Sequence, residues 1–466
     1  MSRISIAWQR LPTWRQAAGR RPWRIALGLP LLVLTVILGP AAPASGAGHA
    51  MTPAVGHTPH YIYTGPATQA TVFSCQANTA PVRCYGPNQI RQAYDIAPLL
   101  RGGVTGKGRT IVIVDAYQSP TILHDLQTFD GLFGLSDPTL NIIAPDGLTA
   151  FDPNDPNQVG WAGEISLDVE WAHAIAPDAT IDLVLAKSNM DSDILSATRY
   201  AVTTNLGDVI SQSFGEAEAC AAATLAAQHQ LFQQATVKRI TLLASSGDQG
   251  VAQPTCDGTS YTRSASTPAS DPLVTGVGGT QLDANARTGA YEGEIAWNEP
   301  LFGAASGGGY STVYPRPLYQ QGVVGTFAQA RAVPDVAYSA AINGGVLTVW
   351  STSGQGADLV FTFGGTSVGS PQWAGLVALG DQLANGRLGF LNGALYRLGQ
   401  GLTRRQNYHD ITFGNNTFTL PTGASIAGYD TQPGWDAVTG WGTPRAATLV
   451  PALVGEVAAT DAALSQ

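Results

Sequence analysis

Four short runs of β-branched and aliphatic residues, separated by stretches with helical spacing, constrain the fold of this chain most strongly. The runs lie at 109–117 (RTIVIVDAY), 179–186 (ATIDLVLA), 208–213 and 240–245 (ITLLAS), and the helical stretches at about 161–175, 191–205 and 220–236. Runs as apolar as these are typical of strands buried on both faces. Strands that alternate with helices predict an α/β fold with a doubly wound parallel sheet. Further strands are expected near 273–279 and 359–364.

The N-terminal 47 residues have the three-part pattern of an export signal. Several arginines precede an apolar run at 25–38, and small residues follow up to Ala47. An uncleaved membrane anchor is the alternative, but the run is short for a span and contains Pro30. The pair Arg20-Arg21 leaves the twin-arginine route open beside the general one. We therefore expect a secreted, extracellular protein.

The charge balance of the remaining chain excludes some partners. Without residues 1–47 the chain has 18 basic and 33 acidic residues, and only 12% of the whole chain is charged. Such a chain lacks the positively charged surface that nucleic-acid binding needs, so we do not expect nucleic acid as a partner. A sparse, mainly acidic charge set is also compatible with acidic surroundings.

The four cysteines predict two disulfides, because the count is even in a chain that we expect to be exported. We expect the pairs Cys75–Cys84 and Cys220–Cys256. Residues 48–85 are rich in Pro, Thr, Ala and Gly without a sustained period. The expected organisation is an export signal at 1–47, a short leader or pro-segment at 48–85, one large catalytic domain at 86–455 and a tail at 456–466.

A serine at the start of a helix is the first candidate for chemistry. Ser367 stands between a glycine-rich turn and an apolar run with helical spacing, in the segment GGTSVGSPQWAG at 364–375. The positive end of a helix dipole stabilises developing negative charge, so a nucleophile for acyl transfer fits there. Serine is also a common helix cap without any chemistry.

Carboxylates are better candidates than histidines to act on this serine. None of the seven histidines lies in the His-Gly-Thr-His context of a subtilisin-type enzyme. Glu164 and Asp168 are four residues apart in a predicted helix and therefore share one face. If that face met water, the pair would be an ordinary solvated one. Asp248 follows a buried strand in SSGDQG, where sites form in parallel sheets, although Asp-X-Gly is also an ordinary turn.

Taken together, the motifs of residues 85–444 closely resemble those of the sedolisins, the serine-carboxyl peptidases with a subtilisin-like fold. The motifs, in the family's order, are GEISLDVEWAHAIAPDA, VISQSFG, ASSGDQG, VTGVGGT, GGGYSTVYPRPLYQ, VPDVA, GGTSVGSPQWAG, HDITFGNN and GWDAVTGWGTP. The resemblance implies that Ser367 is the nucleophile and Glu164 its general base. It also implies that Asp168 positions Glu164, and that a protonated Asp248 donates into the oxyanion hole. An ionised glutamate and a protonated aspartic acid coexist only in acid, so the resemblance implies an acid peptidase.

The resemblance also implies one structural Ca²⁺ ion in the C-terminal loops. Asp410 and Asp436 would supply carboxylates, and Ile411, Gln432 and Gly434 would supply backbone carbonyls. Ligands that are all oxygen suit a hard cation. A loop tightened by Asx turns is the alternative.

The chain departs from the family pattern in three respects. Only residues 48–85 stand where the family has a long, folded prodomain. Phe214 replaces a usual tryptophan, and Asp115 stands where glutamate often extends the acid network. Gln432 replaces a usual glycine of the calcium loop.

We therefore expect an exported serine-carboxyl endopeptidase, monomeric, acting on proteins or peptides through an acyl-enzyme on Ser367, without stable membrane association. The alternatives are a subtilisin-type protease and a catalytically silent homologue that binds peptides. We expect substrate to pair as an added strand with residues 213–215 and 307–309.

Overall fold

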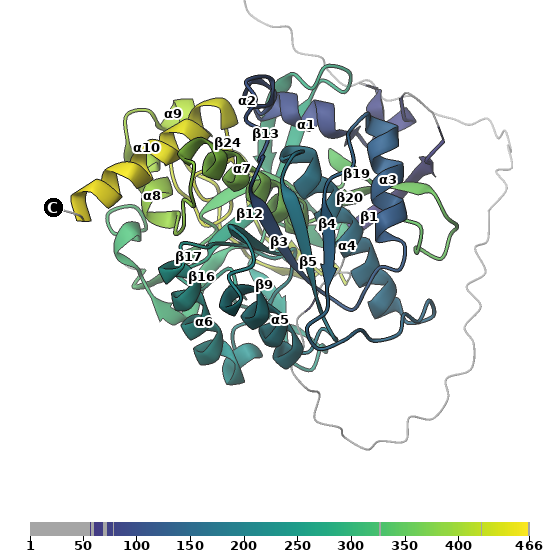
Figure 1. The fold of residues 1–466 in the computed structure, drawn as a ribbon. Helices are drawn as coiled ribbons and strands as arrows, with labels where there is room; N and C mark the ends of the chain where they lie inside the picture. The colour runs from purple at the N-terminus through teal and green to yellow at the C-terminus, as the bar shows by residue number, and fades with distance from the viewer. Residues whose placement is uncertain are drawn as a thin grey trace, which may run out of the picture. The chain divides into compact units, whose positions relative to one another are not determined.

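The structure, a computed structural model, describes residues 56, 60–68, 72–77, 79–325, 328–420 and 422–464 (Figure 1). The expected export signal at 1–47 lies outside the described residues. The described residues lie in one compact unit.

The main sheet has eight strands in the order β13-β12-β8-β6-β3-β5-β4, and β18 also pairs with β12. All neighbours are parallel except β12 and β13. The expected parallel α/β sheet is confirmed. Its strands are β3 (Thr110–Ala116), β4 (Leu140–Ile143), β5 (Thr180–Ala186), β6 (Val209–Gln212), β8 (Thr241–Ser245), β12 (Thr275–Ala284), β13 (Tyr291–Ala296) and β18 (Val336–Ser339).

Helices cover both faces of this sheet (Figure 1). On one face lie α4 (Pro156–Ile175) and α7 (Gly369–Ala384); on the other lie α5 (Asp191–Thr203) and α6 (Leu225–Val237). Successive strand residues point to opposite faces, so Ile111 and Ile113 join the core on one side and Val112 and Val114 the core on the other. This explains why the strand sequences are continuously apolar.

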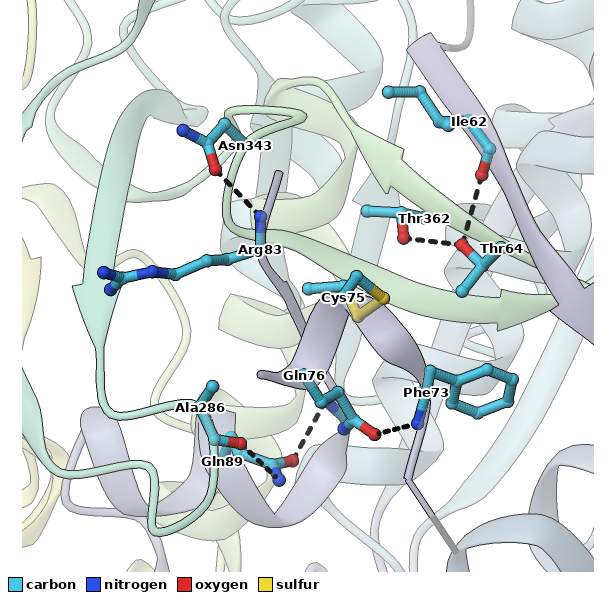
Figure 2. Close-up of a disulfide and its surroundings, with 12 residues drawn as sticks. Ile62, Thr64, Phe73, Cys75, Gln76, Arg83, Gln89, Ala286, Asn343 and Thr362 are labelled. Atoms are coloured by element: carbon cyan, nitrogen blue, oxygen red, sulfur yellow. Dashed lines mark hydrogen bonds between the residues drawn. A yellow bond between two sulfur atoms is a disulfide. The ribbon is translucent and has the colours of Figure 1, made fainter. Parts of the chain in front are cut away.

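A second, four-stranded sheet in the order β1-β20-β19-β2 contains part of the expected leader. Its strands are β1 (His60–Pro66), β20 (Leu359–Gly364), β19 (Gly345–Val349) and β2 (Cys84–Tyr85). Both expected disulfides form, Cys75–Cys84 beside this sheet and Cys220–Cys256 near the main one (Figure 2 shows the first).

The remaining elements are short, apart from α3 and α10. The helices are α1 (Pro87–Ala93), α2 (Ala97–Arg101), α3 (Ile122–Phe133), α8 (Asn392–Gln400), α9 (Arg404–Asn407) and α10 (Ala446–Leu464). The strands are β7 (Glu216–Ala217), β9 (Ala252–Pro254), β10 (Tyr261–Arg263), β11 (Ser266–Thr267), β14 (Asn298–Glu299), β15 (Ala304–Ala305), β16 (Gly309–Pro315), β17 (Ala330–Val333), β21 (Tyr408–His409), β22 (Phe418–Thr419), β23 (Ser425–Ile426) and β24 (Thr443–Pro444).

Helix α10 continues past residue 455, where we expected the catalytic domain to end and the tail to begin. Among the described helices, only this one is long and apolar enough to cross a membrane by length and composition, over Ala446–Ala463.

Candidate active site

Ser367 lies in a single 3-10 turn, Thr366–Val368, between the end of β20 and the start of α7. The turn begins after Gly365, whose φ of 125° is accessible mainly to glycine. A Cβ atom at Gly365 would lie 2.8 Å from Oδ2 of Asp248. The glycine before the serine turn therefore allows the backbone to approach this carboxyl group closely.

Asp248 is fixed by the residue next to the serine. It follows β8, and its Oδ1 accepts hydrogen bonds from the Thr366 backbone N–H (2.8 Å) and from Thr366 Oγ1 (2.7 Å). Both bonds engage Oδ1, and Oδ2 lies beside Gly365. This role of Thr366 was not predictable from the sequence, because one threonine after two glycines carries no distinctive signal.

Helix α4 carries the two carboxyl groups expected to act on the serine. It begins after Asp155, whose side chain accepts a hydrogen bond from the Asn157 backbone N–H at 3.0 Å, with Pro156 at the first helical position. The helix packs on the main sheet beside α7, which lies on the same face. Glu164 and Asp168 are both 0% exposed, which excludes the solvated pair as an interpretation.

A third carboxyl group, Asp115 near the end of β3, completes a buried acid cluster. Burial raises the pKa of Asp115 well above its usual range, and the negative charge of Glu164 raises it further. Burial likewise raises the pKa of Asp168, and the charges of Asp115 and Glu164 add to this effect. Asp115 and Asp168 therefore retain protons in acid.

The cluster reaches Ser367 through Ser213, just after β6. Ser213 Oγ donates to Asp168 Oδ1 at 2.9 Å, and Ser367 Oγ donates to the Ser213 carbonyl at 3.4 Å. The second bond is long, as catalytic hydrogen bonds often are before substrate binds. Ser213 thus links Asp168 to Ser367, and Thr366, the neighbour of Ser367, holds Asp248. Glu164 lies close enough to Asp115 and Asp168 for its charge to raise their pKa values.

A cavity of about 240 Å³ opens onto Ser367. Residues 213–215, Asp248, Gln253 and both cysteines of the second disulfide are among its lining, and no described histidine is. The expectation for residues 307–309 was wrong. These residues are buried. The N–H groups of Gly307 and Gly308 already donate hydrogen bonds to the carbonyls of Gly247 and Gly250, so they are not free to pair with a substrate strand.

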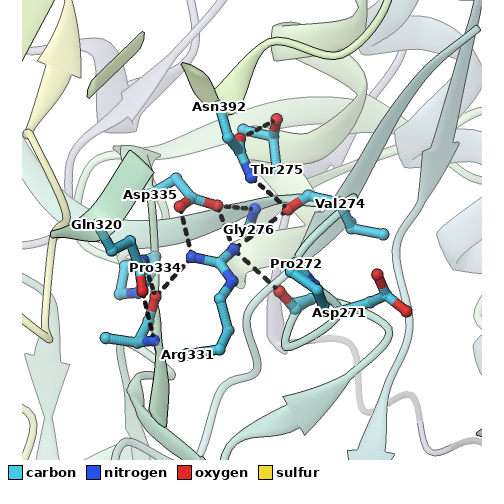
Figure 3. Close-up of polar contacts among 12 residues, drawn as sticks. Asp271, Pro272, Val274, Thr275, Gly276, Gln320, Arg331, Pro334, Asp335 and Asn392 are labelled. Carbon is cyan, nitrogen blue, oxygen red and sulfur yellow. Dashed lines mark hydrogen bonds and ion pairs between the residues drawn. The ribbon is translucent and has the colours of Figure 1, made fainter. Parts of the chain in front are cut away.

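A buried arginine, Arg331, ties the VPDVA motif to the segment that leads into β12 (Figure 3). Arg331 is 0% exposed and bonds the Asp335 carboxylate through both terminal nitrogens, at 2.6 and 2.5 Å. It also donates to the carbonyls of Ala269 (3.5 Å) and Val274 (3.2 Å). The VPDVA motif thus has a structural role, since Asp335 also accepts the Gly276 N–H of β12 at 2.8 Å.

The two carboxylates of the expected calcium site flank one loop. Asp410 accepts the Gly434 N–H at 3.0 Å and lies 3.3 Å from an Arg404 nitrogen. Asp436 is 1% exposed and accepts the backbone N–H groups of Gln432 (3.2 Å), Val438 (2.9 Å) and Thr439 (2.8 Å). Ile411, between the two acidic segments, is also buried. Among the described residues, no cluster of three or more His, Cys, Asp or Glu side chains could hold a metal.

Comparison with known proteins agrees with this geometry. A solved Pseudomonas sedolisin, a serine-carboxyl proteinase complexed with pseudo-iodotyrostatin, superimposes with a TM-score of 0.68. It is 32% identical, and the match covers 80% of this chain and 98% of that one. The chain belongs to the sedolisin family.

Two curated relatives extend the comparison. The kumamolisin of a Bacillus species (strain MN-32) is 34% identical over 82% of this chain and 66% of its own length. The sedolisin of a Pseudomonas species (strain 101) is 32% identical over 78% of this chain and 60% of its own length. This chain thus matches slightly less than two thirds of the length of each of these two relatives. No family model matches the chain.

Proposed function

We propose that this chain is a serine-carboxyl endopeptidase that cleaves proteins or peptides in acid. The observation that carries the proposal is the pair of hydrogen bonds that links Asp168, Ser213 and Ser367 at the edge of the cavity. Membership of a family whose named members include a serine-carboxyl proteinase supports it.

In the proposed reaction Ser367 Oγ attacks the substrate carbonyl while Glu164 accepts its proton. Glu164 then gives this proton to the leaving amine, and an acyl-enzyme on Ser367 remains. Water then gives a proton to Glu164 and attacks the ester carbonyl. The ester bond to Ser367 Oγ breaks, Glu164 returns the proton to Oγ, and the peptide acid is released. Asp168 and Asp115 hold Glu164 in place, and protonated Asp248 donates from Oδ2 to the developing oxyanion.

Acid operation follows from the same groups. Asp248 can donate only when it is protonated, and Glu164 can accept a proton only when it is ionised. The raised pKa values of Asp115 and Asp168 support this, because neutral neighbours allow one buried carboxylate to exist where three could not.

The direct test is peptide cleavage from pH 2 to 9 by the wild type, Ser367→Ala and Glu164→Gln. We expect activity in acid only, reduced at least about a thousandfold in both variants, since members of one catalytic unit are each essential. Full activity at pH 8 would favour the subtilisin-type alternative. A folded wild type that binds peptide but never cleaves it would favour the silent homologue.

We further propose that Ca²⁺ binds between Asp410 and Asp436, with the backbone carbonyls of Ile411, Gln432 and Gly434 as further ligands. The donor set fits a hard cation because all its atoms are oxygens. Asp436 is a buried carboxylate without an ion-pair partner among the described residues, and Asp410 has only Arg404. A bound ion would neutralise the two carboxylates and tie the C-terminal loops together.

Secretion, a monomeric state and the absence of stable membrane association remain our proposals. The two disulfides support an oxidising compartment.

A further inference from the structure

The backbone of Asp248 is held by a neighbouring segment, residues 305–308. The Asp248 carbonyl accepts the Ala305 N–H at 2.9 Å, and the Ala305 carbonyl accepts the Gly250 N–H at 2.9 Å. The N–H groups of the two glycines at 307 and 308 donate to the carbonyls of residues 247 and 250. Hydrogen bonds to one segment thus flank Asp248 on both sides, while Thr366 holds its side chain separately at Oδ1.

Glycine allows this segment to touch two other backbones at once. A Cβ atom at Gly307 would collide with the Ser246 carbonyl oxygen, and one at Gly308 would collide with the Ala437 carbonyl oxygen. Any larger residue at either position would force the backbones apart. The segment is therefore packed between the loop that carries Asp248 and the C-terminal loop at 437, and a shift of the segment would move the Asp248 loop with it.

Ser306 anchors the segment to the main sheet. The residue is 0% exposed, and its Oγ accepts the Gly279 N–H of β12 at 2.9 Å and donates to the Val438 carbonyl at 2.6 Å. Its backbone N–H donates to the Trp297 carbonyl at 3.0 Å. A hydroxyl suits this position because one oxygen both donates and accepts. Ser306 therefore fixes the segment relative to β12 and to the C-terminal loop.

The position of Asp248 matters because its Oδ2 is the proposed donor to the oxyanion. Such a donor is effective when it is already in place as the charge develops, and small displacements lower the rate. Thr366 fixes Oδ1 from the turn that also carries Ser367. The segment 305–308 supports the backbone of the same residue from a different part of the chain.

We propose that Ser306 is a positioning residue of the oxyanion hole, which holds Asp248 at its place beside Ser367 through residues 305–308. The proposal rests on the peptidase function above and deepens it, since Ser306 acts only through Asp248. Loss of its hydroxyl should lower kcat and leave KM nearly unchanged, because the contact with the oxyanion exists only in the transition state.

The first test compares substitutions in the full chain. Ser306→Ala removes both bonds of Oγ and should lower kcat about 10- to 100-fold, with KM within about twofold. Ala305→Gly keeps the backbone bonds but gives the segment more freedom, so this milder variant should lower kcat about threefold. Thr241→Val, at the other end of β8, is the matched control. It removes a buried hydroxyl that donates to the Gly389 carbonyl at 2.7 Å, and kcat should not change. Melting curves identify the folded variants, and wild-type kcat in folded Ser306→Ala would overturn the inference.

A double-mutant cycle shows whether Ser306 acts through Asp248. Asp248→Ala removes the donor and should lower kcat about 100- to 1,000-fold. Adding Ser306→Ala should lower kcat no further, because residues that act as one unit are not additive. If the two factors multiply instead, Ser306 acts elsewhere and the positioning role is overturned. Wild-type kcat in Asp248→Ala would contradict both the oxyanion role of Asp248 and the positioning role of Ser306.

Binding of a peptide aldehyde separates failure of this inference from failure of the proposed function. Ser367 Oγ adds to the aldehyde carbon, its proton passes through Glu164 to the carbonyl oxygen, and this oxygen takes the place of the oxyanion. Ser306→Ala should weaken aldehyde binding by the same factor as kcat and leave the Kd of the corresponding peptide alcohol unchanged. Equal aldehyde affinity in the wild type and folded Ser306→Ala would overturn the inference.

Two further outcomes concern the wild type itself. A wild type that binds the aldehyde but never cleaves peptides would contradict the peptidase, and the aldehyde affinities would still decide the role of Ser306. A folded wild type that neither cleaves peptides nor binds the aldehyde would contradict both proposals.

Discussion

At the scale of single residues, the site depends on crowding carboxyl groups that would ordinarily repel each other. Asp115, Glu164 and Asp168 are each 0% exposed. Burial raises the pKa values of Asp115 and Asp168, so protons rather than cations neutralise them. Such a cluster suits a general base in acid and would be costly at neutral pH.

Replacing Asp115 with Asn tests this interpretation, because Asn has the shape of the protonated acid. We expect Asp115→Asn to retain activity within about threefold on the acid side of the optimum, and to shift the alkaline limb of the pH–rate profile. Ionisation of Asp115, whose raised pKa lies on that side, no longer contributes to the limb. A hundredfold loss at the acid optimum would show instead that Asp115 has a role that needs its charge.

At the scale of elements, the site depends on how closely α4 and α7 approach. Gly375 of α7 faces Ile175 at the end of α4, and a Cβ atom there would lie 2.6 Å from the Ile175 Cβ. Glycine thus sets the spacing of the helix that carries Glu164 and the helix that follows Ser367.

We expect Gly375→Ala to destabilise the fold by about 1–3 kcal/mol, as overpacking does. It should also lower kcat by up to about a hundredfold, because small displacements of reacting groups are costly. Gly455→Ala in α10, where an added Cβ meets no atom within 4 Å, is the matched control and should be neutral or stabilising. Thermal melting and steady-state kinetics measure both effects. Equal behaviour of the two variants would contradict the spacing argument.

The main elements were predictable because their residues repeat a local pattern. The runs at 109–117 and 240–245 contain strands β3 and β8. The helix expected at 161–175 is most of α4, which begins five residues earlier at Pro156. The second sheet was not predictable, because β1 pairs with β20 from a distant part of the chain and β2 is too short to show a pattern. Within the site, the motifs predicted roles for Ser367, Asp248 and the acid pair, and these roles remain our proposals. The contacts of Thr366 and Ser306 depend on tertiary packing that carries no local signal.

Across the whole molecule, several carboxyl groups outside the site are also buried. Burial raises the pKa values of Glu170 and Asp381, the latter to about 8. It also raises that of Glu216 to about 8, with the charge of Asp191 adding to the effect. Between its ordinary pKa and its raised pKa, each of these groups is protonated in the folded state and ionised in the unfolded state.

Stability should therefore be greatest in acid and fall as the pH rises from about 4.5, the ordinary range of these groups, to about 8. In that window the folded state binds more protons, and each such group lowers the free energy of unfolding by up to about 1.4 kcal/mol per pH unit. Glu216→Gln, which mimics the protonated acid, should keep the stability in acid and flatten the decline. Melting curves from pH 4 to 8 check this, and an unchanged slope would argue against Glu216 as a contributor.

The proposed calcium site also depends on the whole fold, which brings Asp410 and the loop before Asp436 together. Chelation should lower Tm by several degrees, since an ion that binds only the folded state stabilises it. In Asp410→Asn the chelator should have little further effect. Equal Tm with and without chelator in the wild type would contradict the site.

In the proposed mechanism the carboxylate of Glu164 deprotonates Ser367, and trapping the acyl-enzyme tests this step. Wild type and Glu164→Gln would be mixed with an activated peptide ester in mild acid, quenched, and the peptide that contains Ser367 followed by mass spectrometry. We predict a covalent adduct on Ser367 that forms at least about a hundredfold more slowly in Glu164→Gln. An adduct that forms equally fast in that variant, or on another residue, would contradict the account.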